Sequence, residues 1–245
     1  MEDIDLGGRV ALVTGSASGL GRGLALALAD CGADVAIHYY SSAEEAAATV
    51  AEARERGVNA TRVQGDVTDP GSVDDLFDEI ESELGGVDVL VNNVGDFAPR
   101  HWEAIDLEEW NRVLETNLNG TMLCSRRALP GMRDREWGRI VNVGYASSEK
   151  AMVGATNFPY FVAKTGVLMF TRMLAADTQD DGITVNAVSP YVVETSDEFP
   201  DEAPRGRWAT VEDVANAALF FCRADSDYVS GENVEIDGGW LPEAI

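Results

Sequence analysis

Short apolar runs alternate with longer amphipathic stretches along the whole chain, and this alternation carries most of the structural information. Seven runs of four or five residues, rich in Val, Ile, Leu and Ala, predict β-strands at Val10–Thr14, Asp34–His38, Ala60–Gln64, Val87–Val91, Arg139–Val143, Thr184–Val188 and Asn233–Ile236. Most of these runs lack a polar–apolar alternation. That pattern is typical of parallel strands that are covered on both faces.

Six stretches between the strands show the apolar spacing of helices. They are Leu20–Ala29, Ala43–Arg56, Ser72–Leu84, Leu107–Met132, Pro159–Ala176 and Val211–Cys222. Ser72 and Asp75 resemble the start of a capping box, and Gly57 predicts the end of the second helix. No repeat or linker interrupts the pattern. The chain therefore predicts an α/β fold over residues 1–245: a single-domain, doubly wound (Rossmann) parallel seven-stranded sheet with helices on both faces.

The charge balance is strongly acidic. Asp and Glu number 43 against 18 Lys and Arg, which gives a formal net charge of −25. Such a surface repels phosphates and anionic membranes, so we expect neither a nucleic acid nor a membrane as partner. Only Lys150 and Lys164 are lysines. Few lysines and many carboxylates are typical of halophilic proteins, in which concentrated cations screen the repulsion; the alternative is a merely acidic protein.

Cysteine usage and the N-terminal residues indicate a cytoplasmic protein. Cys31, Cys124 and Cys222 are far apart and form no C-x-x-C pair, so neither a disulfide framework nor a metal site is expected. The first residues, MEDIDLGGRV, are acidic and lack the apolar core of a signal peptide. No run approaches the roughly 18 apolar residues that a membrane helix requires.

A glycine-rich turn lies between the first predicted strand and the first predicted helix. It reads Thr14-Gly-Ser-Ala-Ser-Gly-Leu-Gly21, and its candidate cofactor-binding residues are Gly15, Ser18, Gly19, Leu20 and Gly21. Glycines at this place let the backbone approach a pyrophosphate, which then sits at the helix N-terminus. A plain tight turn is the alternative. Arg22 either adds positive charge beside this site or is a solvated helix residue.

The end of the second strand bears on the choice of cofactor. An NAD-selective site places Asp or Glu there on the ribose hydroxyls, whereas this chain reads His38-Tyr39-Tyr40-Ser41-Ser42. The absence of a carboxylate leaves room for a 2′-phosphate near Tyr39, with hydroxyl donors from Ser41 and Ser42 and a further candidate donor in His38. No Arg in this segment is available to clamp the phosphate. NADP(H) is therefore favoured over NAD(H).

Two further strand ends carry candidate cofactor residues. Asp66 and Val67 follow the third strand, where the carboxylate either accepts the adenine amino group or closes a turn. Asn93 and Gly95 follow the fourth strand and are candidates for lining the cofactor crevice.

Tyr160 and Lys164 lie four residues apart in a predicted helix, so the phenol and the ammonium share one helix face. A phenol of pKa about 10 is a weak acid–base catalyst at neutral pH, and a neighbouring cation favours its ionised form. One of only two lysines in the chain stands at this position, which favours a catalytic pair over an exposed one.

Together these motifs resemble the short-chain dehydrogenase/reductase family over essentially the whole chain, and most closely its 3-oxoacyl-carrier-protein reductase branch. The resemblance rests on the glycine turn, Asn92-Asn93-x-Gly95, Asn117, Tyr160-x-x-x-Lys164 and Asn186-Ala-Val-Ser-Pro190. It implies an oxidoreductase that interconverts a carbonyl, such as a 3-oxoacyl thioester or another ketone, and a secondary alcohol.

The resemblance also implies roles for individual residues. Tyr160 would exchange a proton with the substrate oxygen, and Lys164 would hold the nicotinamide ribose and lower the pKa of the phenol. Asn117 would bend its helix and hold a water of the proton relay. Pro190, Val193 and Thr195 match the segment that orients the nicotinamide carboxamide. Family members usually form homotetramers, which is the expectation for this chain.

The family's catalytic serine is ambiguous here. Counting back thirteen positions from Tyr160 gives Ser147, whereas counting forward along Asn142-Val143-Gly144 gives Tyr145. We favour Ser147, because a small hydroxyl polarises a carbonyl without filling the pocket. Tyr145 and Ser148 stay open as alternatives.

The substrate is open as well. Acidic residues after the Tyr160 helix, Asp177-Thr-Gln-Asp-Asp181, do not suit an acidic carrier protein, although Arg126, Arg127, Arg133 and Arg135 lie on the preceding helix. Tyr191 replaces a glycine of the family and either packs in the core or lines the substrate pocket.

The alternative to an enzyme is a non-catalytic, nucleotide-binding scaffold or regulatory homologue.

Overall fold

The computed structural model describes residues 4–146, 148, 155–196 and 199–240. Seven parallel strands form one sheet in the order β3-β2-β1-β4-β5-β6-β7. Their bounds are β1 Val10–Val13, β2 Asp34–Tyr39, β3 Ala60–Gln64, β4 Val89–Asn92, β5 Gly138–Val143, β6 Ile183–Pro190 and β7 Asn233–Ile236. The predicted strands are confirmed, and their ends differ by no more than two residues.

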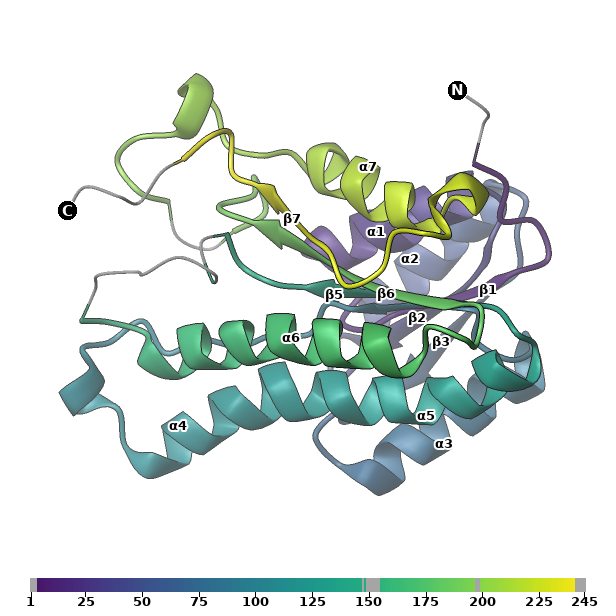
Figure 1. Cartoon of the computed structure of the whole chain (residues 1–245), viewed down its shortest axis with the longest axis horizontal. Coiled ribbons are helices and arrows are strands. Elements are labelled where there is room, and N and C mark those ends of the chain that lie inside the picture. The colour runs from purple at the N-terminus through teal and green to yellow at the C-terminus, as the bar shows by residue number, and fades with distance from the viewer. Residues whose placement is uncertain (1–3, 147, 149–154, 197–198, 241–245) are drawn as a thin grey trace.

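Helices cover both faces of this sheet (Figure 1). The α-helices are α1 Gly19–Asp30, α2 Ala43–Glu55, α3 Pro70–Glu83, α4 Leu107–Leu114, α5 Gly120–Asp134, α6 Phe158–Asp177 and α7 Val211–Cys222. Helices α1, α2 and α7 lie on one face, and α3, α4, α5 and α6 lie on the other. Each face has its own apolar cluster, so both faces of the central strands are buried. This burial explains their continuous apolar sequence.

Local capping fixes where several of these helices begin and end. The side chain of Asp69 accepts the Ser72 backbone N–H, and Pro70 occupies the first turn of α3. The expectation that Ser72 begins this helix is therefore wrong: its hydroxyl instead accepts the Asp66 N–H at 2.7 Å. Gly57 follows α2 with a φ of +88°, as the sequence predicts for a helix end.

The long helix expected over 107–132 is divided in two. Helix α4 passes through a π-helical turn, Glu115–Asn119, into α5. Such a turn is an insertion into the helical ladder and frequently lies at a functional site. Three 3₁₀ turns complete the described elements, at Trp102–Ala104, Pro204–Gly206 and Ala224–Ser226.

The strand order places a switch point between β1 and β4. The chain leaves β1 toward β2 on one side and returns through β4 on the other. At such a point the connections diverge and open a crevice at the carboxyl ends of the strands. Within the described part of the chain, no helix is both long and apolar enough to span a membrane.

Candidate active site

The glycine turn after β1 is shaped to hold a ligand at this switch point. Gly15 and Gly19 have φ values of +65° and +57°, and open space surrounds the position that a Cβ of Gly19 would occupy. A Cβ on Gly21 would lie 2.3 Å from the Gly15 carbonyl oxygen. The turn therefore requires a glycine at position 21, where the backbone packs closely, and exposes its backbone to solvent at Gly19. This arrangement fits a pyrophosphate at the start of α1.

Side chains from β1 and β4 hold the floor of the crevice together. The Thr14 hydroxyl oxygen accepts the N–H groups of Asn93 and Val94 at 2.9 and 3.1 Å. The Asn93 amide donates to the Thr14 carbonyl at 2.9 Å. Asn93 thus joins the two strands at the switch point, and its side chain belongs to the scaffold of the site.

His38 holds the same turn from β2. Its Nδ1 accepts the Gly15 N–H at 2.9 Å, and its Nε2 lies 3.1 Å from the Gly65 carbonyl oxygen, which accepts only. The ring is therefore neutral with its proton on Nε2, and burial lowers its pKa. Both nitrogens are used within the protein, so the expectation that His38 donates to a 2′-phosphate is wrong.

One cavity of about 560 Å³ lies over the ends of β2, β3 and β4. Asp66, Val67, Asn93 and Gly95 line it, as the sequence predicts for a site holding the adenosine half of a dinucleotide. Asp66 closes the turn after β3, and its contact with adenine stays a prediction. Its Oδ1 accepts from the backbone and hydroxyl of Thr68 at 2.9 and 2.7 Å, and the residue also faces the cavity.

The residues at the end of β2 lie differently from the expectation. Tyr40, which is 68% exposed, lines this cavity, whereas Tyr39, Ser41 and Ser42 do not. Arg22 does not supply a free charge, because both oxygens of Glu52 accept from its Nη2 at 2.5 Å.

Arg62 on β3 is a cation that the sequence analysis did not place here. Its Nη1 donates to the carbonyl of Ala43, the first residue of α2, at 2.8 Å. In the sheet, Arg62 pairs with Ile37 of β2. That pairing, which is invisible in the sequence, brings the cation next to a segment twenty residues earlier in the chain.

A second cavity, of about 620 Å³, continues from Asn93 and Gly95 toward β5 and β6. The residues that sequence analysis singled out and that line it are Leu20, Asn93, Gly95, Tyr145, Tyr160, Lys164, Pro190, Tyr191, Val193 and Thr195. The two cavities share Asn93 and Gly95 in their linings, so they adjoin each other at the carboxyl end of β4.

Tyr160 and Lys164 meet in this second cavity. The Lys164 Nζ lies 5.6 Å from the centre of the Tyr160 ring and donates to the Val143 carbonyl at 2.7 Å. Lys164 is 4% exposed, and burial lowers its pKa to about 8. Burial raises the pKa of Tyr160, and the neighbouring Tyr145 adds to the rise. Lys164 is not among the groups that shift this pKa, and its expected lowering of the phenol pKa stays a prediction.

Asn117 lies in the π-helical turn between α4 and α5, where the family resemblance implied a bend. Its amide donates to the carbonyls of Asp96 and Val113 at 2.6 and 2.9 Å, whereas its buried Oδ1 has no hydrogen-bond partner. A Cβ on Gly95 would lie 2.8 Å from this oxygen. An unpaired buried acceptor beside the cavity is suited to a water or a ligand donor.

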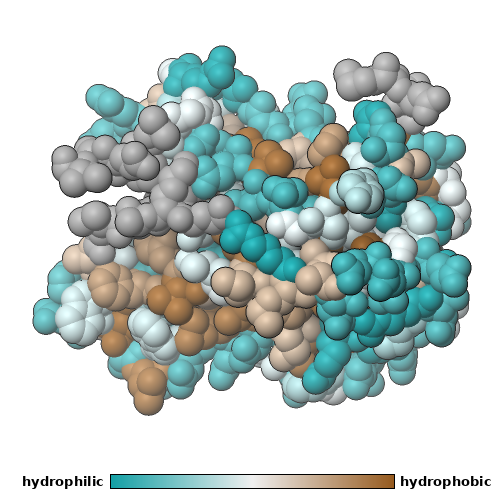
Figure 2. Space-filling view, in the orientation of Figure 1, coloured by the Kyte–Doolittle hydropathy of each residue, from teal (hydrophilic) through white to brown (hydrophobic). Residues whose placement is uncertain are grey.

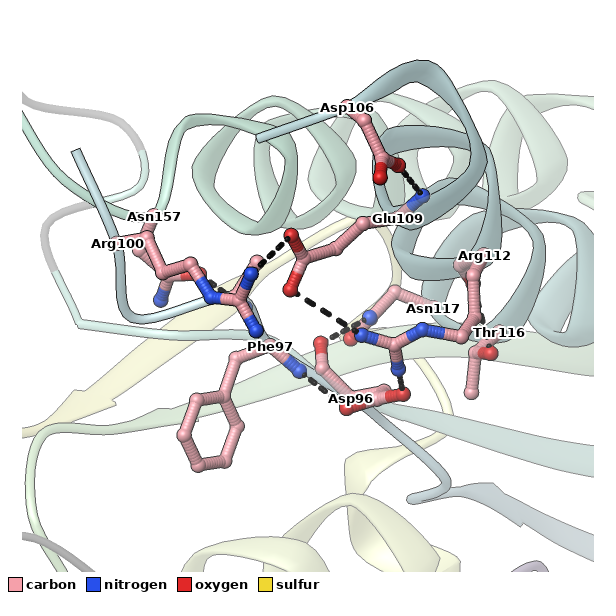
Figure 3. A network of polar contacts seen from close by, with 10 residues as sticks. Asp96, Phe97, Arg100, Asp106, Glu109, Arg112, Thr116, Asn117 and Asn157 are labelled. Carbon is pink, nitrogen blue, oxygen red and sulfur yellow. Dashed lines mark hydrogen bonds and ion pairs between the residues drawn. The ribbon is translucent and has the colours of Figure 1, made fainter. Parts of the chain in front are cut away.

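A network of charged side chains surrounds this corner of the site (Figure 3). Arg112 pairs with Asp96, and Glu109 lies between Arg112 and Arg100. Asn157, just before α6, accepts the Ala98 N–H at 2.8 Å. The segment 96–98 after β4 is thereby fixed to both the π-helical turn that contains Asn117 and the start of α6.

The three candidates for the serine position lie in different surroundings. Tyr145 lines the cavity, and its ring centre is 5.6 Å from that of Tyr160. The Ser148 hydroxyl donates to the Tyr145 carbonyl at 2.7 Å, and Ser148 does not line the cavity. Ser147, the favoured candidate, lies outside the described residues.

No group of His, Cys, Asp or Glu side chains in the described ranges could hold a metal ion. The three cysteines are free, and burial raises the pKa of each thiol.

Comparisons with known proteins agree with this geometry. A family model described as "Enoyl-(Acyl carrier protein) reductase" matches residues 15–241. The chain is 36% identical to a 3-oxoacyl-[acyl-carrier-protein] reductase of Aquifex aeolicus, covering 97% of this chain and 99% of that one. It is 35% identical to the Staphylococcus aureus protein of the same name, covering 94% and 96%.

A solved structure is also similar. The gluconate 5-dehydrogenase of Burkholderia cenocepacia, in complex with NADP and tartrate, matches with a TM-score of 0.89 and 32% identity, covering 97% of this chain and 96% of that one. These similarities extend over nearly the full length of each chain and include both cavities. The chain is therefore an oxidoreductase that belongs to the short-chain dehydrogenase/reductase family.

Proposed function

We propose that this protein is an NADP(H)-dependent oxidoreductase that interconverts a small ketone and a secondary alcohol, with Tyr160 as the acid–base group. One observation carries the proposal: Tyr160 and Lys164 line a cavity that adjoins, at Asn93 and Gly95, a second cavity suited to adenosine. A nicotinamide and a carbonyl substrate then share the space beside the phenol.

The proton chemistry follows from the state of the phenol. In reduction, a bound nicotinamide cofactor would supply a hydride to the carbonyl carbon, and the Tyr160 hydroxyl would give its proton to the carbonyl oxygen. The raised pKa of Tyr160 keeps this proton in place until negative charge develops on the oxygen. In the reverse direction, the ionised phenol takes the proton of the alcohol.

Lys164 and Asn117 support this step. The Lys164 Nζ, held by the Val143 carbonyl at 2.7 Å, is placed to bind the ribose hydroxyls next to the nicotinamide. The unpartnered Oδ1 of Asn117 is placed to accept from a water of the proton relay.

The carbonyl-polarising hydroxyl comes from Ser147 or Tyr145. The position of Tyr145 in the cavity supports Tyr145, whereas the small size of serine favours Ser147. Parallel kinetics of Ser147→Ala and Tyr145→Phe separate the two. The variant that lowers kcat about 100-fold identifies the donor.

The preference for NADP(H) is supported by Arg62. Its guanidinium donates to the Ala43 carbonyl, one residue after Ser42, and β2 itself ends without a carboxylate. We expect Arg62→Gln to lower the ratio of kcat/KM for NADPH over NADH about tenfold, because hydrogen bonds to charged groups contribute about 1.5–3 kcal/mol. Arg54 is the matched control, since it donates to the Ala60 carbonyl at the other end of the same helix and strand. Arg54→Gln should leave the ratio unchanged.

Small molecules suit the substrate role better than a carrier protein. Arg127 pairs with Asp78 and Glu81, and Arg133 pairs with Asp177 and Asp181. These arginines are neutralised by carboxylates of this chain, so they do not form a basic docking surface for an acidic partner.

The α4–α6 face supports the proposal of a homotetramer. Apolar side chains gather over these two helices in Figure 2. Leu107, Val162, Met169 and Met173 are 52–72% exposed there. A second copy of the chain would cover this surface.

NADPH oxidation with a panel of neutral ketones tests the enzyme proposal. Tyr160→Phe should abolish turnover and still bind NADPH, whereas Tyr228→Phe, at a fully exposed tyrosine, should behave as the parent. Cofactor binding by the parent without turnover of any carbonyl would favour the scaffold alternative.

A further inference from the structure

The wall of the substrate space next to Tyr160 is aromatic. The ring of Phe97 lies 6.4 Å from that of Tyr160 at an interplanar angle of 77°, and the ring of Tyr145 lies 5.6 Å away at 75°. Tyr145 in turn lies 6.1 Å from Tyr191. All four rings line the same cavity. A substrate whose carbonyl oxygen reaches the Tyr160 hydroxyl is therefore bordered by aromatic faces and edges.

The mouth of this cavity is also aromatic. Phe97 and Phe199 line the cavity and are 39% and 48% exposed, and Phe199 packs at 5.6 Å against Trp208. Single exposed apolar side chains are normal on a protein surface, but both of these line the cavity that also contains Tyr160. Their place at the cavity mouth indicates an apolar ligand.

Charged ligands find no suitable partner in the described lining. Lys164 is the only Lys, Arg, Asp or Glu among the described lining residues. One of its three N–H groups donates to the Val143 carbonyl, and the proposed function assigns the others to the ribose hydroxyls of the cofactor. A substrate carboxylate placed here would lose its hydration without gaining a cation.

From these observations we infer that the substrate is a neutral ketone that carries an aromatic or similarly bulky apolar group beside its carbonyl. The inference rests on the proposed function and adds the substrate class. It separates this chain from the similar gluconate 5-dehydrogenase, whose named substrate is an anionic polyol. Each turnover consumes one NADPH and one proton and converts the ketone into the secondary alcohol.

A matched pair of substrates tests the charge requirement. Methyl 4-acetylbenzoate and 4-acetylbenzoate present the same aryl methyl ketone, and only the second carries a carboxylate. With the full-length protein in molar KCl and NADPH, we expect kcat/KM for the ester to exceed that for the acid at least about tenfold. We expect 5-ketogluconate to be poorer than either.

Variants of the mouth test the aromatic contact. Phe199→Ala and Phe97→Ala should each raise KM for the aryl ketone about 3- to 10-fold, with a smaller change in KM for acetone. Phe220→Ala is the control, because Phe220 is 44% exposed and does not line the cavity. It should change neither KM.

The outcomes distinguish the substrate class from the enzyme proposal. Turnover of 5-ketogluconate or 4-acetylbenzoate in preference to the ester overturns the inference and leaves the ketone reductase standing. Equal effects of Phe199→Ala on both ketones also overturn it. Absence of turnover with every carbonyl contradicts the proposed function itself.

Discussion

Gly19 offers the sharpest test of how this protein holds its cofactor. The residue begins α1 with a φ of +57°, and no atom lies within 4 Å of the place that a Cβ would take. Gly57, which follows α2, has a φ of +88° and equally open surroundings. Both glycines are exposed. The substitutions Gly19→Ala and Gly57→Ala therefore impose the same kind of backbone strain at two places, of which only one lies in the glycine turn after β1.

The effect on folding should be similar in the two variants. An alanine in the left-handed region costs about 1–2 kcal/mol, and the reduced freedom of the unfolded chain offsets about 0.4–1 kcal/mol of that cost. Neither methyl group meets a neighbour, so no steric penalty is added. We expect each variant to lose about 1 kcal/mol of the free energy of unfolding.

The effect on binding should differ sharply. At Gly19 the methyl group projects into the space where a pyrophosphate would contact the backbone at the start of α1. Losing even one charge-assisted hydrogen bond to the phosphate costs about 1.5–3 kcal/mol of binding free energy. That loss raises the Kd for NADPH about 10- to 150-fold. At Gly57 the methyl group points into solvent, away from both cavities, and Kd should not change.

Urea unfolding and NADPH fluorescence titration, both in molar KCl, measure the two quantities independently. We expect the two variants to lose the same free energy of unfolding and to differ in their Kd for NADPH. If Gly19→Ala binds NADPH within about twofold of the parent, the glycine turn does not hold the phosphates. If Gly57→Ala weakens binding as strongly, the effect comes from general destabilisation and not from the crevice.

Three further outcomes are expected. Lys164 has a pKa of about 8 against an ordinary 10.5, so between pH 8 and 10.5 the unfolded chain binds more protons than the folded one. The free energy of unfolding therefore rises with pH over this interval, by up to about 3 kcal/mol. Urea unfolding at pH 8 and 10 should show a smaller rise in Lys164→Met, and an equal rise would contradict the assignment. Met173→Asp combined with Met169→Asp should convert an oligomer into smaller species in light scattering, and an unchanged mass would exclude the α4–α6 face as the interface. Circular dichroism should show loss of helix on dialysis into low salt, because the charge of −25 is then unscreened, and full helicity there would remove the halophilic interpretation.

Local sequence determined the elements and much of the candidate site. The apolar runs predicted all seven strands, because a buried strand needs apolar residues on both faces wherever it lies in the sheet. The glycine turn and the Tyr160–Lys164 pair were also identifiable, because their geometry depends on residues within one turn or one helix. The family resemblance implied a bend at Asn117, and Asn117 lies in a π-helical turn between α4 and α5.

Tertiary structure decided the properties that depend on contacts across the sheet. Arg62 reaches Ala43 only because β3 pairs with β2 in one register, and the ring of His38 is neutral because Gly15 and Gly65 enclose it. The raised pKa of Tyr160 comes from burial beside Tyr145, which a helical spacing does not reveal. Hydrophobic periodicity is a local property of the chain, whereas desolvation and charge pairing depend on which distant residues the fold brings together.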